Sequence, residues 1–148
     1  MRVTEALGAL IGQWSGTNQL RVIPDDPYRE SVATAAVGTV AQGGFLTVAY
    51  TWADGGDPQD GLLLVGDGPA PGQAIATWVD SWHQSPEWMV LRGTVGEDGG
   101  EVHLDGRYSP DAQWRIHLRT DGAGWRMTMD NVMPGHDYPV VEAIFRTA

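Results

Sequence analysis

Apolar and polar residues alternate along most of the chain, which is the pattern of β-strands that bury one face. Trp114, Ile116 and Leu118, for example, alternate with two arginines and a histidine, and the segments 101–108 and 125–130 repeat the pattern. The run from Leu62 to Val65 is apolar on both faces, so we expect its outer face to be covered.

Clusters of glycine, proline and aspartate recur at short intervals and divide the chain into segments of strand length. Glycine supplies positive φ and proline fixes φ, so these clusters are turn signals. Consecutive short strands joined by hairpin-length turns favour an up-and-down meander, and closing its sheet removes the exposed edges. We therefore predict one all-β domain over residues 1–148, a closed antiparallel up-and-down barrel of about ten strands. A two-sheet sandwich is the alternative.

The beginning of the chain follows a helical period instead. Four apolar side chains fall on one helix face: Val3, Leu7, Leu10 and Ile11. Thr4 is placed to cap the helix and Gly12 to end it. The sequence thus predicts a short N-terminal helix ahead of the first strand.

Composition narrows the function classes. The 148 residues contain no cysteine, which excludes disulfides, thiolate metal sites and cysteine nucleophiles. The net charge of −10 and the dispersed arginines disfavour binding to nucleic acid. No apolar run approaches the roughly 20 residues of a membrane-spanning helix, and the first residues do not form a secretory signal. We expect a cytoplasmic protein.

The sequence Gly12-Gln13-Trp14, at the start of the first predicted strand, resembles the Gly-x-Trp signature of lipocalins and related barrels. This resemblance implies that Trp14 plugs the closed end and that an arginine near the end of the last strand lies against it. Arg146 matches that position. We therefore expect the Arg146 guanidinium to stack on the Trp14 indole.

A narrower resemblance covers nearly the whole chain. The matching segments are Leu10 to Gly16, Trp78 to Ser85, Met127 to Asn131 and Tyr138 to Glu142. They are similar to a bacterial lipocalin-like family of uncharacterised function, the domain-of-unknown-function family fifteen-seventy-nine, which belongs with the calycin-like barrels. The resemblance implies the barrel fold, and because the family has no established catalytic residues, it leaves the function open.

The candidate ligand site is a set of aromatic, methionine and polar residues on strand faces predicted to point inward. Its members are Trp78, Asp80, Trp82, Trp114, Trp125, Met127, Met129, Asn131 and Glu142. Aromatic and methionine side chains either fill a core or line an adaptable cavity. A barrel of this strand number can hold a ligand, so we predict binding of a small hydrophobic or amphipathic molecule.

Three of these candidates are polar. Asp80, Asn131 and Glu142 each share a strand face with apolar neighbours, Glu142 with Val140 and Ile144. If those faces point inward, the polar groups either pair within the protein, for instance with a tryptophan N–H, or orient a ligand.

An enzyme is the first alternative, with Asp80 and Glu142 as acid and base and His83 as a further candidate. Ser81 and His83 lie on the strand face opposite Asp80, which is the wrong geometry for a catalytic triad. No nucleophile elbow, phosphate loop or dinucleotide motif is present. Catalytic residues are therefore not assigned.

Two further alternatives remain. His136 stands where a related heme-binding barrel family has its axial ligand, although the other motifs of that family are missing. His103 and His117 are predicted to face solvent, and we expect neither a metal site nor a cofactor. The apolar run Leu62 to Val65 leaves open a protein-interaction barrel, with a homodimer as the simplest case.

Overall fold

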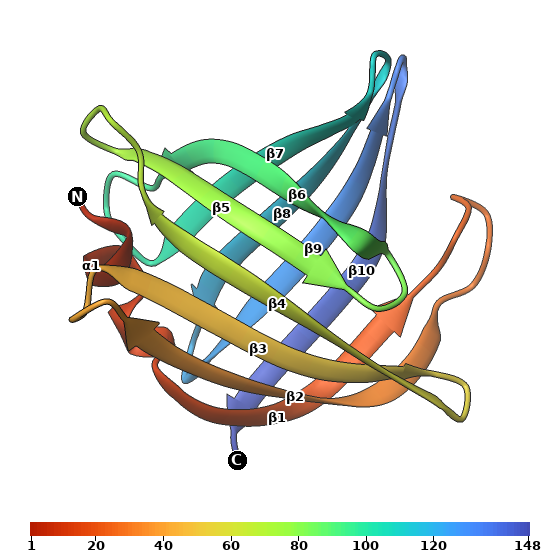
Figure 1. The fold of residues 1–148 in the computed structure, drawn as a ribbon. Helices are drawn as coiled ribbons and strands as arrows, with labels where there is room; N and C mark the ends of the chain where they lie inside the picture. Colours follow the sequence, from red (N-terminus) through yellow and green to blue (C-terminus); the bar gives the residue numbers. More distant parts are fainter.

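The protein is a closed barrel of ten antiparallel strands in a computed structural model that describes residues 1–148 (Figure 1). The strands are β1 Gly12–Leu20, β2 Arg29–Val40, β3 Phe45–Asp54, β4 Asp57–Asp67, β5 Gln73–Asp80, β6 Gln84–Val95, β7 Glu101–Ser109, β8 Ala112–Asp121, β9 Gly124–Met133 and β10 His136–Thr147. Each strand pairs with its neighbours along the chain, and β1 pairs with β10 to close the sheet. The predicted up-and-down barrel is confirmed, and the two-sheet sandwich is wrong.

One end of the barrel is covered by the short helix α1, Val3–Ala6, and the 3₁₀ turn η1, Gly8–Leu10 (Figure 1). We call this the helix end and the opposite one the far end. Val3, Leu7 and Leu10 are fully buried, as predicted. Ile11 is 49% exposed, because the chain has already left the helix and its 3₁₀ turn at this residue.

The N-terminus of α1 is held by a carboxylate from another element. Val3 N–H donates to Asp67 Oδ1 at 2.8 Å, and Arg2 Nε donates to Oδ2 of the same side chain at 2.9 Å. Thr4 lies within the helix and makes no cap, so its predicted role is wrong. Asp67 satisfies a free N–H of the first turn, as an N-cap side chain would.

Trp14 closes the helix end, but not with Arg146. The Trp14 indole Nε1 donates to the Leu10 carbonyl at 2.6 Å, and its ring meets Trp125 edge to face at 6.3 Å. The Arg146 side chain is 52% exposed, and its Nη2 lies 3.6 Å from Asp121 Oδ2. The predicted stacking is wrong because successive strand residues face opposite sides, and Phe145 takes the inner position.

The outer face of β4 is not covered. Leu63 and Val65 point into the core and are fully buried, whereas Leu62 on the outer face is 41% exposed. The double-sided apolar run therefore contributes one face to the core and one to an apolar surface, contrary to our expectation.

The barrel wall is weakly paired at one place. β6 and β7 form a ladder of only four residue pairs, from Arg92 opposite Asp105 to Val95 opposite Val102. Towards the far end, the part of β6 before Arg92 has no partner in β7. Met89 packs against Gly106 across this gap, where a Cβ on residue 106 would lie 2.6 Å from the methionine sulfur. The wall therefore has no backbone pairing between these parts of β6 and β7, and side chains close the gap.

Candidate functional site

A cavity of about 240 Å³ lies at the far end, next to the unpaired parts of β6 and β7. Its six lining residues come from β5, the turn of residues 81–83, β6, β7 and β8: Trp78, His83, Gln84, Met89, Tyr108 and Trp114. Two of these, Trp78 and Trp114, belong to the predicted site. The cavity is predominantly aromatic, which suits a planar apolar molecule.

Two parallel indoles form one wall of the cavity. The rings of Trp78 and Trp114 stack with centroids 5.6 Å apart and an interplanar angle of 10°. Trp78 Nε1 donates to the Tyr50 hydroxyl at 2.8 Å. Trp114 Nε1 is buried and has no acceptor in the protein. One of the two indole N–H groups on this wall therefore lacks a hydrogen-bond partner in the protein.

His83 lies among four tryptophans. Its ring is 5.5 Å from Trp52, 4.7 Å from Trp82 and 5.3 Å from Trp114, centroid to centroid, and it also stacks on Trp78. His83 Nε2 is buried without a hydrogen-bond partner in the protein. Burial lowers the pKa of His83, and the nearby Asp80 carboxylate offsets this only in part. The imidazole is therefore neutral near pH 7, and its Nε2 has an unused capacity for one hydrogen bond.

Asp80 determines the position of His83. Its Oδ1 accepts hydrogen bonds from the backbone N–H groups of Trp82 and His83, both at 2.9 Å. Its Oδ2 accepts from the Tyr50 hydroxyl at 2.7 Å and from Trp52 Nε1 at 3.3 Å. The side chain is 2% exposed, so all four donors compensate its burial. Asp80 therefore holds the turn together. Of the two roles considered for this side chain, its contacts are those of pairing within the protein, including a bond from a tryptophan N–H.

Burial of His83 predicts a pH dependence of stability. The unfolded chain protonates this residue near its ordinary pKa of 6.5, and the folded chain only at lower pH. The free energy of unfolding should therefore fall as pH decreases from about 7.5 to about 5.5, since the unfolded state binds more protons there. Urea unfolding across this range should show a weaker dependence for His83→Gln. His136→Gln, at an exposed histidine, should keep the wild-type dependence; equal slopes for both variants would contradict the prediction.

Asn131 is the second polar candidate, and it lies beside the cavity. Its Oδ1 accepts from the Tyr108 hydroxyl at 2.5 Å, and its Nδ2 donates to the Tyr138 hydroxyl at 3.1 Å. Tyr138 in turn donates to the Val22 carbonyl at 3.1 Å. Asn131 is therefore not part of the cavity lining, but it binds the hydroxyl of Tyr108, which is.

Glu142 is on the outer face of the barrel, so the expectation that it points inward is wrong. Its Oε1 accepts from Arg126 Nη1 at 2.7 Å. A register shift in the β9–β10 ladder between Pro139 and Val141 reverses the alternation, so Val140 and Val141 are both buried. Asp80 and Glu142 lie on opposite sides of the wall and do not form an acid–base pair.

The remaining candidates are not on the cavity. Trp125, Met127 and Met129 are at most 1% exposed and belong to the packed core. Trp82 is 38% exposed, because β5 ends at Asp80 and residue 82 lies in the following turn rather than on the strand. Its ring still meets Trp52 and His83 edge to face, so it covers His83 from outside.

Strand alternation assigned His83 to the side opposite Asp80 and left it out of the ligand site. The signal that could have found it is the Asp-x-x-His spacing at a strand end, because an aspartate often bonds the backbone two and three residues on. Tyr50 and Trp52, the partners of Asp80, are contributed by β3, and no local pattern identifies them.

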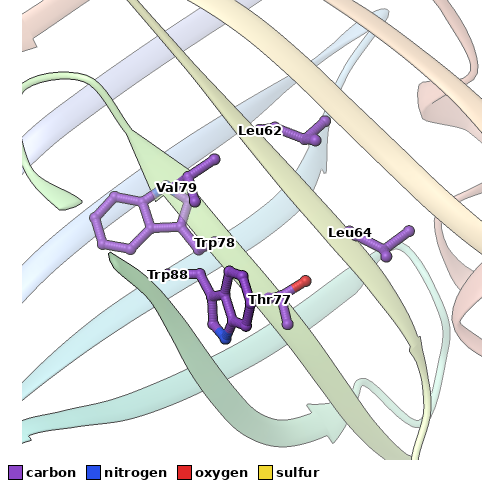
Figure 2. A pocket seen from close by; sticks show the side chains of 6 residues that line it. All are labelled: Leu62, Leu64, Thr77, Trp78, Val79 and Trp88. Carbon is purple, nitrogen blue, oxygen red and sulfur yellow. The ribbon is translucent and has the colours of Figure 1, made fainter. Parts of the chain in front are cut away.

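A second hollow lies on the outer surface of β4, β5 and β6. Figure 2 shows its lining of Leu62, Leu64, Thr77, Trp78, Val79 and Trp88, around a volume of about 320 Å³. Trp88 is 69% exposed and Leu62 41% exposed, so this outer groove is open to solvent. Its lining has almost no polar groups.

The histidines outside the cavity face solvent. His103 and His117 lie on the outer faces of β7 and β8, as predicted, and His136 is exposed at the start of β10. The single α-helix, α1, has four residues, and the structure contains no membrane-spanning helix.

The fold and the site define a ten-stranded antiparallel barrel with a small aromatic cavity at the end opposite its N-terminal helix. The chain belongs to the family described as protein of unknown function (DUF1579), which matches residues 3–144. A crystal structure of Rv2717c from M. tuberculosis has a similar fold, with a TM-score of 0.72 over 99% of this chain and 97% of that chain. The two sequences are 16% identical. The comparison with curated proteins gives no significant match.

Proposed function

We propose that this barrel binds a small, planar, mostly apolar ligand at the far-end cavity. The observation that carries the proposal is the pair of buried polar atoms, His83 Nε2 and Trp114 Nε1, that lack protein partners next to an aromatic cavity. Buried polar groups are nearly always hydrogen-bonded, so two such atoms beside one cavity favour a ligand with a polar atom in its ring. The ring itself would lie among the indoles.

The volume of the cavity limits the size of the ligand. Its volume of about 240 Å³ lies below the roughly 300–1,000 Å³ usual for drug-sized molecules. A bicyclic heteroaromatic compound is therefore a better match than a long lipid. The weakly paired wall between β6 and β7 supplies an entry, with Met89 as the flexible side chain that must move.

An unpartnered indole N–H is not sufficient evidence of a site. Trp125 Nε1 also lacks a partner, but this ring is fully buried and stacks on Phe145 at 4.4 Å. Trp114 differs because it borders a cavity. The enzyme alternative has less support, since Asp80 is occupied by four protein donors and Glu142 is outside the barrel.

Titration with quinoline, whose ring nitrogen accepts a hydrogen bond, tests the proposal. We expect saturable one-to-one binding that shifts the NMR signals of the His83 ring. Trp114→Phe keeps an aromatic plane but removes the N–H, and should weaken binding by roughly 2- to 12-fold, the value of one hydrogen bond.

The matched control is Trp125→Phe, which removes the other unpartnered indole N–H from the solid core. It should leave quinoline affinity unchanged once the variant is shown to be folded. Equal weakening by both variants, or the absence of His83 shifts on saturation, would contradict binding at this cavity. Native mass spectrometry of freshly purified protein would identify a natural ligand that co-purifies.

A homodimer through the outer groove is a second proposal. It is supported by the exposed apolar side chains of Leu62, Val79 and Trp88, which lie together on one face (Figure 2). Light scattering decides it, since a strict monomer at all concentrations would contradict it.

A further inference from the structure

Three potential metal ligands meet on the outer face of β7 and β8, away from the cavity. Glu101 and His103 are two residues apart on β7, so their side chains share a face. His117 on β8 lies directly opposite His103 in the ladder. The three side chains are part-exposed, with His117 the most buried at 20% side-chain exposure.

The donor atoms converge. Glu101 Oε2 lies 3.0 Å from His117 Nε2 and 3.6 Å from His103 Nε2. All three ligand atoms lie within 4.8 Å of one another. In a tetrahedral zinc site with bonds of about 2.0–2.2 Å, neighbouring ligand atoms are about 3.3–3.6 Å apart. The Glu101–His103 distance is at the upper end of that range, and the Glu101–His117 distance is slightly shorter than the range.

The imidazoles are arranged side by side. Their rings stack with centroids 3.9 Å apart and an interplanar angle of 15°. Both Nε2 atoms point to the same carboxylate oxygen. A metal ion between them requires the rings to open slightly so that their lone pairs converge. His103, with 45% of its side chain exposed, has the freedom to rotate.

We propose that Glu101, His103 and His117 form a site for a divalent transition metal ion, with Zn²⁺ as the first candidate. Two imidazoles and one carboxylate suit Zn²⁺, Ni²⁺ or Cu²⁺ and do not suit Ca²⁺ or Mg²⁺, which take oxygen ligands. Three protein ligands leave at least one coordination position for water or an outside ligand. This proposal departs from our expectation that the protein has no metal site.

The side chains around the three ligands affect how tightly the site can bind a metal ion. The ladder neighbours of the two histidines are threonines, Thr94 beside His103 and Thr128 beside His117, and these small side chains leave room for the ion. Arg119 lies opposite Glu101 and adds a positive charge nearby. We expect weaker binding than at a closed structural zinc site, where four ligands surround the ion.

The experiment is calorimetric titration of the chelator-treated full chain with ZnCl₂, together with Co²⁺ titration read by visible d–d absorption. The wild type should bind one Zn²⁺ per chain, and Co²⁺ should give a tetrahedral spectrum. Removing one ligand, by His103→Gln, His117→Gln or Glu101→Gln, should weaken Zn²⁺ binding at least roughly tenfold. Mutation of a residue that only hydrogen-bonds to a metal ligand commonly weakens metal affinity by that much.

His136→Gln is the matched control, because it removes an exposed histidine at the start of β10, outside the cluster, and should leave Zn²⁺ affinity unchanged. In excess chelator, every variant should unfold at the wild-type midpoint, and added Zn²⁺ should raise the midpoint of the wild type and the control only. Absence of saturable binding to the wild type would overturn the proposal. So would one-to-one binding that survives in the His103→Gln, His117→Gln double variant.

Discussion

Replacing Asp80 by alanine is expected to lower the free energy of unfolding by about 3–5 kcal/mol, the usual cost of removing one member of a buried charged network. The change leaves the Tyr50 hydroxyl, the Trp52 N–H and two backbone N–H groups of the turn without their acceptor. Burial and then the Asp80 charge raise the pKa of Tyr50 well above its usual value, so the phenol stays a donor at any working pH. Urea unfolding followed by tryptophan fluorescence measures the effect.

Asp80→Asn separates geometry from charge. The amide keeps one acceptor oxygen but presents an NH₂ group to two of the four donors, so we expect a smaller loss than for alanine. Asp98→Ala, at an exposed turn aspartate, is the matched control and should leave stability nearly unchanged. A loss for Asp80→Ala no larger than that of this control would show that the network does not support the fold.

Trp14→Ala is expected to cost about 3–5 kcal/mol as a truncation of a core aromatic side chain. The indole is 7% exposed, meets Trp125 edge to face and donates to the Leu10 carbonyl that ends the 3₁₀ turn. Its loss would open the helix end of the barrel beneath α1. Thermal and urea unfolding should both report it.

Two further variants identify which contact of Trp14 matters. Trp14→Phe keeps an aromatic ring but removes the N–H, and should cost about 1 kcal/mol, the usual worth of one hydrogen bond. Arg146→Lys should have no measurable effect, because the guanidinium lies on the outer surface beside Asp121 and not on the indole. A destabilisation by Arg146→Lys comparable to that of Trp14→Phe would contradict this conclusion and indicate that Arg146 stacks on Trp14.

Much of the barrel could be predicted from local patterns. Alternation of apolar and polar residues identified the inner faces of β7, β8 and β9, because side chains on a strand point to opposite sides with a period of two. Turn residues separated the strands, and the absence of any long connection implied neighbours in chain order. The same reasoning placed Trp78 and Trp114 inside, where both line the cavity.

The errors about Glu142, Trp82 and His83 arose where the period of two is interrupted. The irregularity near Val140 moved Glu142 to the outside, and the Asp80 turn took Trp82 off the strand and brought His83 inward. A bulge or a side-chain-bonded turn depends on hydrogen bonds that alternation does not encode. Sequence reasoning therefore identified the segment Trp78 to Gln84 but misjudged which of its side chains reach the cavity.

The order of residues along the chain was sufficient to determine the strands, their antiparallel succession and the short helix, since each depends on neighbours within a few positions. Which functional side chains from different strands come into contact depends on the register between those strands. Glu101 and His103 share a face by spacing alone, but His117 joins them only because β8 pairs with β7 in one particular register. In the same way Tyr50 on β3 reaches Asp80 on β5 over Gly61 of β4, a contact between residues 30 positions apart that the register of these three strands creates.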